Sequence, residues 1–375
     1  MADRIKLGIL TGGGDCPGLN AVIRAVVKTA IEECDMEVVG FIDGYEGLVE
    51  NRYKQLKPVD VSGILTRGGT ILGTSNRADP FHFPVLQGDE YIFLDQSSQV
   101  VKNFERLGLD VLIAIGGDGT MAASHQMAEK GLKIVGVPKT IDNDLWGTEQ
   151  TVGFDSALTS ATDAIDKIHS TAQSHHRVMV VEVMGRYAGW LALASGMAGG
   201  GDVVLVPEFP YQIEVICDMI KKRNRRGKNF SIVVIGEGSK PKGGEMVVKR
   251  VVENSPDKIR LGGISYHLAS QIEEETSLEA RVTILGHLLR GGTPTPYDRI
   301  LASRLGVEAV RLARDRRFGF MAALKGGQVE SVPIQEVAGK IRVIEPDTPL
   351  LQTALALGTC LGVDHLDNPE KKNQK

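Results

Sequence analysis

Two loops that contain aspartate, residues 116–120 and 139–144, each follow a short hydrophobic run. The first reads Gly-Gly-Asp-Gly-Thr and the second Lys-Thr-Ile-Asp-Asn-Asp. Each hydrophobic run is typical of a buried strand. Loops that leave the same ends of parallel strands face one crevice, where open α/β sheets bind ligands. The first loop could hold a phosphate and a metal ion, and the second could remove a proton. Together they predict phosphoryl transfer to an alcohol.

The aspartates in these loops have distinct uses. Asp118 offers the oxygen ligand that Mg²⁺ prefers, beside glycines that leave room for phosphates. If the second loop is extended, Asp142 and Asp144 point the same way. One carboxylate could then accept a hydroxyl proton while the other orients it or touches the metal. The plainer interpretations are a helix with Asp118 as its N-cap and an ordinary turn rich in Asp and Asn.

A third glycine-rich loop, residues 12–15, reads Gly-Gly-Gly-Asp and lies between an expected strand and an expected helix. Backbone N–H groups at the start of a helix favour a phosphate there. The glycine order is not G-x-G-x-x-G, which disfavours a nicotinamide dehydrogenase. No Gly-Lys-Ser/Thr is present either, which excludes a Walker-type loop.

An anionic substrate would need a local cluster of cations, because the net charge of the chain is −4. Several basic residues lie at expected strand ends or in loops, most of them beside glycine or another basic residue. A sugar phosphate would be bound by such a cluster. Glu237, which follows an expected strand, could bind sugar hydroxyls. The basic candidates are Arg177, Arg186, Arg281, His287 and Arg290.

Length and composition limit the class of protein. A chain of 375 residues is expected to form two domains. It is 42% hydrophobic and 24% charged, as globular proteins are, and its net charge gives no general affinity for nucleic acid or an anionic membrane. Four scattered cysteines argue against a disulfide framework and a zinc site. No hydrophobic stretch approaches the roughly 20 residues that span a bilayer. We therefore expect a cytoplasmic protein.

The alternation of strand and helix patterns predicts an α/β fold with mainly parallel sheets covered on both faces. Two sheets, separated near Thr151, suit this length. Helices are expected at 20–34, 99–107, 156–170, 187–197, 213–222, 264–274 and 298–312. Between 44 and 97 the sequence is rich in glycine and turn residues, with one short helix expected near 59–65.

Taken together, these segments resemble the 6-phosphofructokinase family, and within it the phosphofructokinase A type and its mixed-substrate branch. The series is far more specific than any single motif, and it runs in order over roughly residues 5 to 315. The matching segments are 12–15, 68–70, 116–120, 140–144, 183–186, 286–292 and 296–299.

The resemblance implies two Rossmann-like, three-layer α/β domains with the active site in the cleft between them. The donor-binding domain would comprise residues 1–150 with roughly 289–335. The fructose 6-phosphate-binding domain would comprise 151–288 with roughly 336–366, and 367–375 would form a flexible tail. Arg177 and Arg281 match family arginines that reach the 6-phosphate from a neighbouring subunit, so a homodimer or homotetramer is implied.

The resemblance also assigns roles to single residues. Asp142 would be the general base on the 1-hydroxyl of fructose 6-phosphate, and Asp118 would hold Mg²⁺. Thr140, Asp144 and Arg186 join Asp142 as catalytic residues. The implied sugar-phosphate ligands are Thr140, Asp142, Asp144, Arg177, Met184, Gly185, Arg186, Glu237, Arg281, His287 and Arg290. The implied nucleotide ligands are Gly13, Asn76, Arg77, Gly116, Gly117, Asp118, Gly119, Thr120 and Lys139.

The phosphoryl donor is decided by two residues that point in opposite directions. Gly119 leaves space for the α-phosphate of ATP, where pyrophosphate-dependent relatives carry aspartate. Lys139 looks like the pyrophosphate enzymes, because well-known bacterial ATP enzymes have glycine there. We give Gly119 more weight and expect ATP, because an open space is required for it. Asn76 stands where an arginine bridging two phosphates is usual, and Arg77 could replace it.

Other interpretations stay open. A pyrophosphate-dependent phosphotransferase is the nearest rival. A catalytically silent regulatory subunit would lack Asp142 or Asp118, and both are present. Lipid and NAD kinases share Gly-Gly-Asp-Gly-Thr but lack the Thr-Ile-Asp-Asn-Asp and Met-Gly-Arg segments. The usual effector site of bacterial relatives is altered at Lys28 and His169, which leaves open whether this is an allosteric enzyme and what its effector is.

Overall fold

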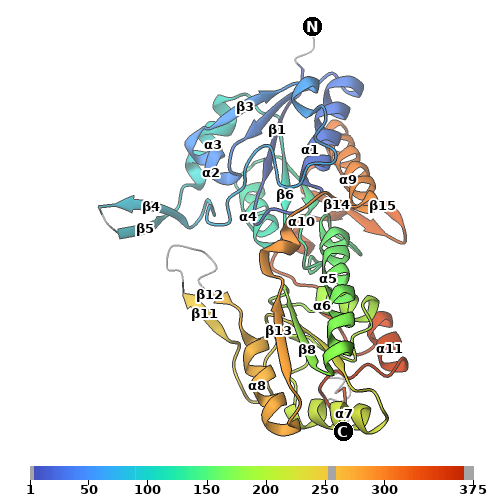
Figure 1. The fold of residues 1–375 in the computed structure, drawn as a ribbon. Coiled ribbons are helices and arrows are strands. Elements are labelled where there is room, and N and C mark those ends of the chain that lie inside the picture. The colour runs from blue at the N-terminus through green and yellow to red at the C-terminus, as the bar shows by residue number, and fades with distance from the viewer. Residues whose placement is uncertain (1–3, 89, 252–258, 367–375) are drawn as a thin grey trace, which may run out of the picture. The chain divides into compact units, whose positions relative to one another are not determined.

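The computed structural model describes residues 4–88, 90–251 and 259–366, so the tail expected at 367–375 lies outside the described residues (Figure 1). The described chain divides into two compact units. The first unit comprises residues 4–156 and 290–341, and the second comprises 157–251, 259–289 and 342–366. The chain leaves the first unit after Ser156 and returns to it at Arg290.

The first unit is built on a seven-stranded sheet with the order β15-β14-β7-β6-β1-β2-β3. Its five inner strands run parallel, and only the edge strands β3 and β15 run antiparallel to their neighbours. The strands are β1 (Lys6–Thr11), β2 (Glu37–Phe41), β3 (Tyr53–Leu56), β6 (Val111–Gly116), β7 (Ile134–Pro138), β14 (Phe320–Lys325) and β15 (Gln328–Pro333).

Helices cover both faces of this sheet. On one face α1 packs against α9, where Gly306 lies close to the main chain of Val22 (Figure 1). On the other face a hydrophobic core joins the sheet to α2, α3, α4 and α10 through Leu48, Phe104 and Met121. The helices are α1 (Leu19–Lys28), α2 (Tyr45–Glu50), α3 (Ser97–Arg106), α4 (Asp118–Glu129), α9 (Pro296–Arg314) and α10 (Ile334–Val337).

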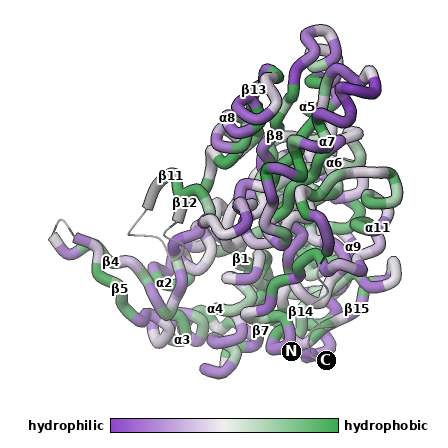
Figure 2. The backbone as a smooth tube through the Cα atoms, turned by 90° about the horizontal axis from the view of Figure 1, so that it is seen from below, coloured by the Kyte–Doolittle hydropathy of each residue, from purple (hydrophilic) through white to green (hydrophobic). Residues whose placement is uncertain are grey.

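The second unit repeats this architecture on a smaller, fully parallel sheet with the order β13-β8-β10-β9. Helices α7 and α8 cover one face through Ile216, Ile220 and Leu268. Strand β8 and helix α6 consist mostly of hydrophobic residues (Figure 2). The strands are β8 (Val178–Val183), β9 (Val203–Leu205), β10 (Ser231–Gly236) and β13 (Ala280–Ile284), and the helices are α5 (Phe154–His175), α6 (Trp190–Ala198), α7 (Ile213–Arg225), α8 (Ile264–Thr276) and α11 (Pro349–Ala356). The predicted α/β class with mainly parallel sheets is confirmed.

Several local elements differ from the sequence prediction. The helix expected near 59–65 is only a 3₁₀ turn at Pro58–Val61, because the chain becomes extended at Ser62 and then turns at Gly63, which has a φ of 73°. The same glycine-rich region also holds the antiparallel hairpin of β4 (Phe83–Gln87) and β5 (Glu90–Leu94). A second hairpin is formed by β11 (Val248–Val251) and β12 (Ile259–Leu261). Helix α1 is followed by a π-helical turn at Thr29–Glu33.

Within the described ranges, no helix is both long and apolar enough to cross a bilayer.

Candidate active site

The glycine-rich loops follow β1 and β6, which are neighbours in the first sheet. The N–H group of Gly12 donates to the carbonyl of Ile115, 2.8 Å away. The Thr120 side chain, which is 8% exposed, fills the space between the two loops. A Cβ atom on Gly12 would lie 2.6 Å from Thr120 Oγ1, and one on Gly116 would lie closer still. Both glycines are therefore required by packing, and the Thr120 side chain is used for that packing.

The first turn of α4 presents Asp118 and Gly119 at the surface of the unit. The N-cap is Gly117, which makes no side-chain hydrogen bond, and Asp118 is the first helical residue. The interpretation of Asp118 as an N-cap is therefore wrong, and its carboxylate remains available to a ligand. A Cβ atom on Gly119 would meet no other atom of the described protein within 4 Å. The space expected beside this loop is present.

The second aspartate loop, which follows β7, is held in shape by Asn143. This residue is buried and adopts a φ of 53°, a conformation that asparagine tolerates better than most residues. Its side-chain oxygen accepts a hydrogen bond of 3.0 Å from the N–H of Thr151, and its amide donates to the carbonyl of Glu149. The Thr151 hydroxyl in turn donates to the carbonyl of Thr140 at 2.6 Å. The loop is thus pinned at both ends.

The carboxylates of the first unit repel one another. The pKa of Asp144 is raised from its ordinary value to about 7, mainly by burial and also by the negative charges of Asp142 and Asp118. A hydrogen bond with Thr140 acts in the opposite direction. The N–H of Asp142 donates to the Thr140 hydroxyl at 3.1 Å. The predicted catalytic residues Thr140, Asp142 and Asp144 therefore form one interacting group.

A cation would relieve this repulsion. In the part of the chain that the structure describes, no group of three His, Cys, Asp or Glu side chains could hold a metal ion. Mg²⁺ commonly needs only one or two carboxylates, since water and substrate phosphates complete its shell. Asp118 is exposed, and its charge acts on the carboxylate of Asp144. These two carboxylates fit an open Mg²⁺ site of that kind better than a closed cage of protein ligands.

Two cations lie against the loop at residues 12–15. Lys139 is 4% exposed, and its Nζ donates a 2.6 Å hydrogen bond to the carbonyl of Gly14. Arg290 lies so close that a Cβ atom on Gly14 would overlap its guanidinium group. Arg290 was predicted to bind the sugar phosphate, but its side chain rests on the glycine loop of the first unit. Lys139, predicted as a nucleotide ligand, contacts the loop itself.

The segment that carries Asn76 and Arg77 runs beside the glycine loop. Gly13 donates to the carbonyl of Ser75 at 3.0 Å, and the Thr74 hydroxyl lies within hydrogen-bond distance of the carbonyls of Thr11 and Gly13. Asn76 and Arg77 follow directly and are both exposed. The predicted nucleotide residues of the first unit thus lie on neighbouring strand ends and on this paired segment.

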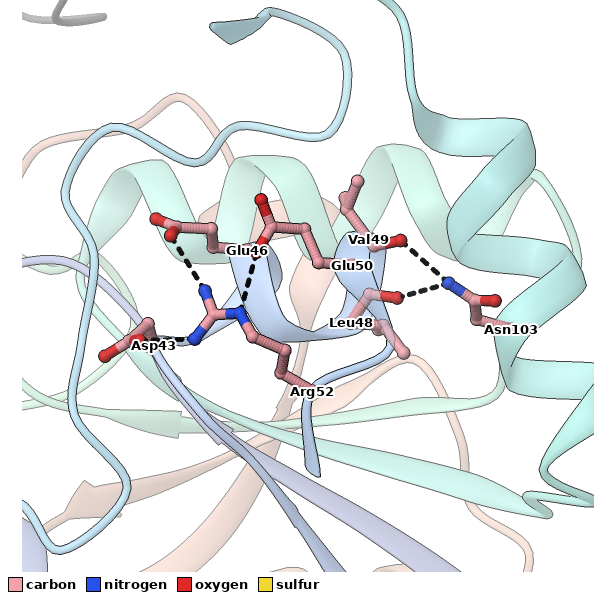
Figure 3. A network of polar contacts seen from close by, with 7 residues as sticks. All are labelled: Asp43, Glu46, Leu48, Val49, Glu50, Arg52 and Asn103. Carbon is pink, nitrogen blue, oxygen red and sulfur yellow. Dashed lines mark hydrogen bonds and ion pairs between the residues drawn. The ribbon is translucent and has the colours of Figure 1, made fainter. Parts of the chain in front are cut away.

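A polar network holds the turn after β2 in the same region (Figure 3). Arg52 donates to three carboxylates, and hydrogen bonds with Asp43 and Glu50 raise its pKa above the ordinary range. The Arg52 bonds reach Asp43 at 2.7 Å, Glu46 at 2.8 Å and Glu50 at 2.7 Å. The N–H of Asp43 donates to the carbonyl of Leu72, so this network anchors the segment that leads to Thr74.

In the second unit, three predicted sugar-phosphate segments gather at the carboxyl ends of neighbouring strands. Met184 to Arg186 follow β8, Glu237 follows β10 and His287 follows β13. The N–H of Glu237 donates to the carbonyl of Val183, and that of Gly238 donates to Gly185. Gly185 has a φ of 133°, which glycine alone adopts readily. The Arg186 guanidinium lies 5.6 Å from the centre of the Tyr187 ring.

Arg177 and Arg281 lie at the opposite ends of these strands. Arg177 precedes β8, and Arg281 is the second residue of β13. Both donate hydrogen bonds to Glu279, and the bond from Arg177 is the main cause of the lowered pKa of that carboxyl. Along β8, Arg177 and Met184 are about 23 Å apart at ~3.3 Å per residue. Within one chain, the structure does not bring these two arginines to the other sugar-phosphate residues.

Comparison with known proteins gives the family. A family model described as Phosphofructokinase matches residues 6–313. The chain is 49% identical over 355 residues to ATP-dependent 6-phosphofructokinase 2 of Clostridium perfringens, covering 94% of this chain and 97% of that protein. It is 48% identical to ATP-dependent 6-phosphofructokinase of Spirochaeta thermophila, over 95% of this chain and 97% of the relative. The chain belongs to the phosphofructokinase family.

Solved structures of the family share the fold. Pichia pastoris phosphofructokinase in the T-state matches with a TM-score of 0.77 and 30% identity, over 90% of this chain but only 36% of the yeast chain. Pyrophosphate-dependent phosphofructokinase from Marinobacter aquaeolei matches with a TM-score of 0.78 over 95% of this chain and 92% of its own, at 19% identity. At that identity the likeness shows the two-domain fold alone.

Some residues that shape the site were not singled out from the sequence. Thr151 closes the aspartate loop, but a lone threonine carries no pattern that would reveal this. Glu279 accepts hydrogen bonds from Arg177 and Arg281. Its position two residues before Arg281 was the one sequence signal that could have indicated this pairing. Asp298 lies in the matching segment 296–299, but no role was predicted for it. It is buried and accepts hydrogen bonds from the N–H groups of Gly153 and Ser156, which fixes the start of α5.

Proposed function

We propose that this protein is an ATP-dependent 6-phosphofructokinase, which transfers the γ-phosphoryl group of ATP to the 1-hydroxyl of fructose 6-phosphate in glycolysis. The single observation that carries the proposal is the pinned loop that holds Thr140, Asp142 and Asp144 as one interacting group beside the glycine loops. The names of relatives that are 44% to 49% identical over nearly the whole chain support it.

The first unit is proposed to bind the donor and to supply the base. Asp142 accepts the proton of the 1-hydroxyl as that oxygen forms a bond to the γ-phosphorus. The bond between this phosphorus and its bridging oxygen breaks, and ADP leaves with the electron pair. Proton transfer of this kind commonly contributes about 10² to 10⁴ in rate. The glycine loops and Lys139, with Asn76 and Arg77, form the nucleotide side of the site.

Asp118 and Asp144 are the residues proposed to hold Mg²⁺. The bound ion would neutralise charge on the phosphoryl oxygens, which is the main requirement of phosphoryl transfer. The repulsion between Asp144, Asp142 and Asp118 supports this assignment, because each carboxylate is easier to keep ionised beside a cation.

The second unit is proposed to bind fructose 6-phosphate through Met184, Gly185, Arg186, Glu237 and His287. Arg177 and Arg281, at the other ends of the strands, are proposed to serve a neighbouring subunit of a homodimer or homotetramer in the cytoplasm. Arg290, whose side chain lies against Gly14, is proposed as a further sugar-phosphate ligand. A divided set of phosphate ligands explains why two arginines lie far from the rest of the site.

ATP is the proposed donor because of Gly119. A side chain at this position would occupy the space that surrounds it, and an aspartate would add a charge that repels the α-phosphate. The rival donor is pyrophosphate, and the observation that favours it is Lys139, a cation close to the glycine loop.

The test is formation of fructose 1,6-bisphosphate from fructose 6-phosphate and Mg²⁺, with ATP and pyrophosphate in parallel. Product with ATP alone is the expected result. Product with pyrophosphate alone would overturn the donor assignment, and no product with either donor would favour the catalytically silent subunit.

A further inference from the structure

Lys139 is buried beneath the glycine loop, and its contacts define what it can do. Its Nζ lies 2.6 Å from the carbonyl oxygen of Gly14, and its own N–H donates to the carbonyl of Gly116. A Cβ atom on Gly13 would lie 3.4 Å from the same Nζ. With 4% of the residue exposed, the ammonium group is directed at the main chain of the loop.

Thr74 makes an equivalent contact from a different segment. Its hydroxyl lies 2.6 Å from the carbonyl of Gly13 and 3.0 Å from that of Thr11. Two successive carbonyl oxygens, those of Gly13 and Gly14, are thereby engaged by side chains of the protein. The main chain turns at Gly13 with a φ of 76°, which glycine adopts readily because it has no side chain.

The direction of these carbonyls fixes the direction of two N–H groups. In a planar trans peptide the C=O and N–H bonds point in opposite directions. The N–H groups of Gly14 and Asp15 therefore point away from Thr74 and Lys139. Among the described residues, neither N–H donates a hydrogen bond. Unbonded N–H groups at a turn before a helix bind anions, whereas exposed carbonyl oxygens repel them.

We propose that Lys139, together with Thr74, is a positioning residue that turns the N–H groups of Gly14 and Asp15 toward the phosphates of the donor. Lys139 then acts on the donor through the loop and does not contact it. Its presence is compatible with ATP, and it carries no preference for pyrophosphate. The inference rests on the proposed function only in that the ligand carries phosphates.

The charges around the loop agree with this role. Burial is the main cause that lowers the pKa of Lys139, and Arg290 lowers it further, while Cys16, Asp15 and Asp118 raise it. A lysine donates a hydrogen bond to a carbonyl whether it is charged or neutral, so the contact with Gly14 does not depend on that balance. A direct role as a cation for the donor would depend on it.

The first experiment is hydrogen exchange of the ligand-free protein, which needs no activity. Lys139→Met removes the hydrogen bond and keeps a long side chain, and Thr74→Val removes the hydroxyl. In both variants the hydrogen-bonded amides within residues 11–18, such as those of Gly12 and Gly13, are expected to exchange at least about threefold faster, since the loop loses support. Lys133→Met is the matched control. Lys133 is exposed and directly precedes β7, the strand that Lys139 follows, so its replacement should leave the exchange rates of residues 11–18 unchanged.

The second experiment is calorimetric titration with ADP and Mg²⁺. Each single variant is expected to weaken binding about tenfold, which corresponds to ~1.4 kcal/mol. The double variant should be little weaker than the worse single one, because both changes act on the same loop. Thr74→Ser, which keeps the hydroxyl, should recover most of the lost affinity.

Two results would overturn the inference. The first is normal exchange of residues 11–18 in ligand-free Lys139→Met and Thr74→Val. The second is a double variant whose losses multiply to about a hundredfold, since independent effects indicate that Lys139 contacts the donor directly. If wild-type protein binds no ADP at all, the proposed function fails, while the exchange experiment still tests the loop.

Discussion

The carboxyl ends of the two sheets share a parallel-strand architecture and differ in charge. At the first sheet the loops after β6 and β7 bring Asp118, Asp142 and Asp144 near one another. At the second sheet the loops after β8, β10 and β13 carry Arg186, Glu237 and His287, and a second carboxylate, Glu208, follows β9. The repeated fold thus provides two similar platforms, and loop residues give each a separate task. The first is proposed to hold a metal ion and to accept a proton, and the second to bind an anionic sugar.

The largest expected effect is that of Asp142→Ala, which removes the proposed base from the first platform. Turnover should fall by about 10³ to 10⁴, in the range for a lost general base. Fructose 6-phosphate binding should stay near that of the wild type, because the second platform is unchanged. The measurement is steady-state turnover with ATP, and turnover within tenfold of wild type would reject Asp142 as the base.

A smaller loss of turnover, about 10², is expected for Asp144→Asn, and stability should move in the opposite direction. The pKa of Asp144 is about 7 in the folded protein, above its ordinary value of 3.8. The folded state therefore holds a proton between about pH 4 and 7 that the unfolded state has lost. The stability from this proton is fully present below about pH 4 and is lost as pH rises through about 7.

The ligand-free Asp144→Asn variant should therefore be more stable than wild type at pH 8, and the difference should shrink toward pH 4. Urea unfolding at several pH values measures this. If the free energies of unfolding of the two proteins change with pH in parallel, Asp144 titrates near its ordinary pKa. That result would contradict the proposed repulsion among the carboxylates of the first platform.

Gly119→Asp sharpens the comparison at the donor. The fold should be preserved, since a Cβ atom there meets no atom of the described residues within 4 Å, so any loss of activity reflects an effect on the ligand. We expect kcat/KM with ATP to fall at least about tenfold more than any activity with pyrophosphate, because the added carboxylate repels the α-phosphate. Equal losses with both donors would undo the argument from space.

The parts predicted from the sequence are those set by local patterns. Hydrophobic runs followed by glycine and aspartate located β1, β6 and β7 and the loops behind them, because strand ends and tight turns restrict residue choice. The hairpin of β4 and β5 was missed, since short strands among turn residues carry little periodicity.

Long-range contacts could not be predicted. The carbonyl of Gly14 meets Lys139 across 125 positions of sequence, and no pattern around either residue indicates the pairing. The place of Arg290 on the glycine loop follows from the return of the chain to the first unit, which periodicity does not reveal. The close approach of Thr120 to Gly12 and Gly116 likewise depends on how neighbouring strands are ordered.

The division of tasks between the two platforms is tested most directly by paired binding titrations. Asp142→Ala is titrated with fructose 6-phosphate, and His287→Ala with both fructose 6-phosphate and ADP plus Mg²⁺. The account predicts near wild-type sugar-phosphate affinity for Asp142→Ala. For His287→Ala it predicts about tenfold weaker sugar-phosphate binding with unchanged ADP affinity, in keeping with the loss of one hydrogen bond to a charged ligand. If His287→Ala weakens the binding of fructose 6-phosphate and of ADP equally, the proposed division of tasks is contradicted.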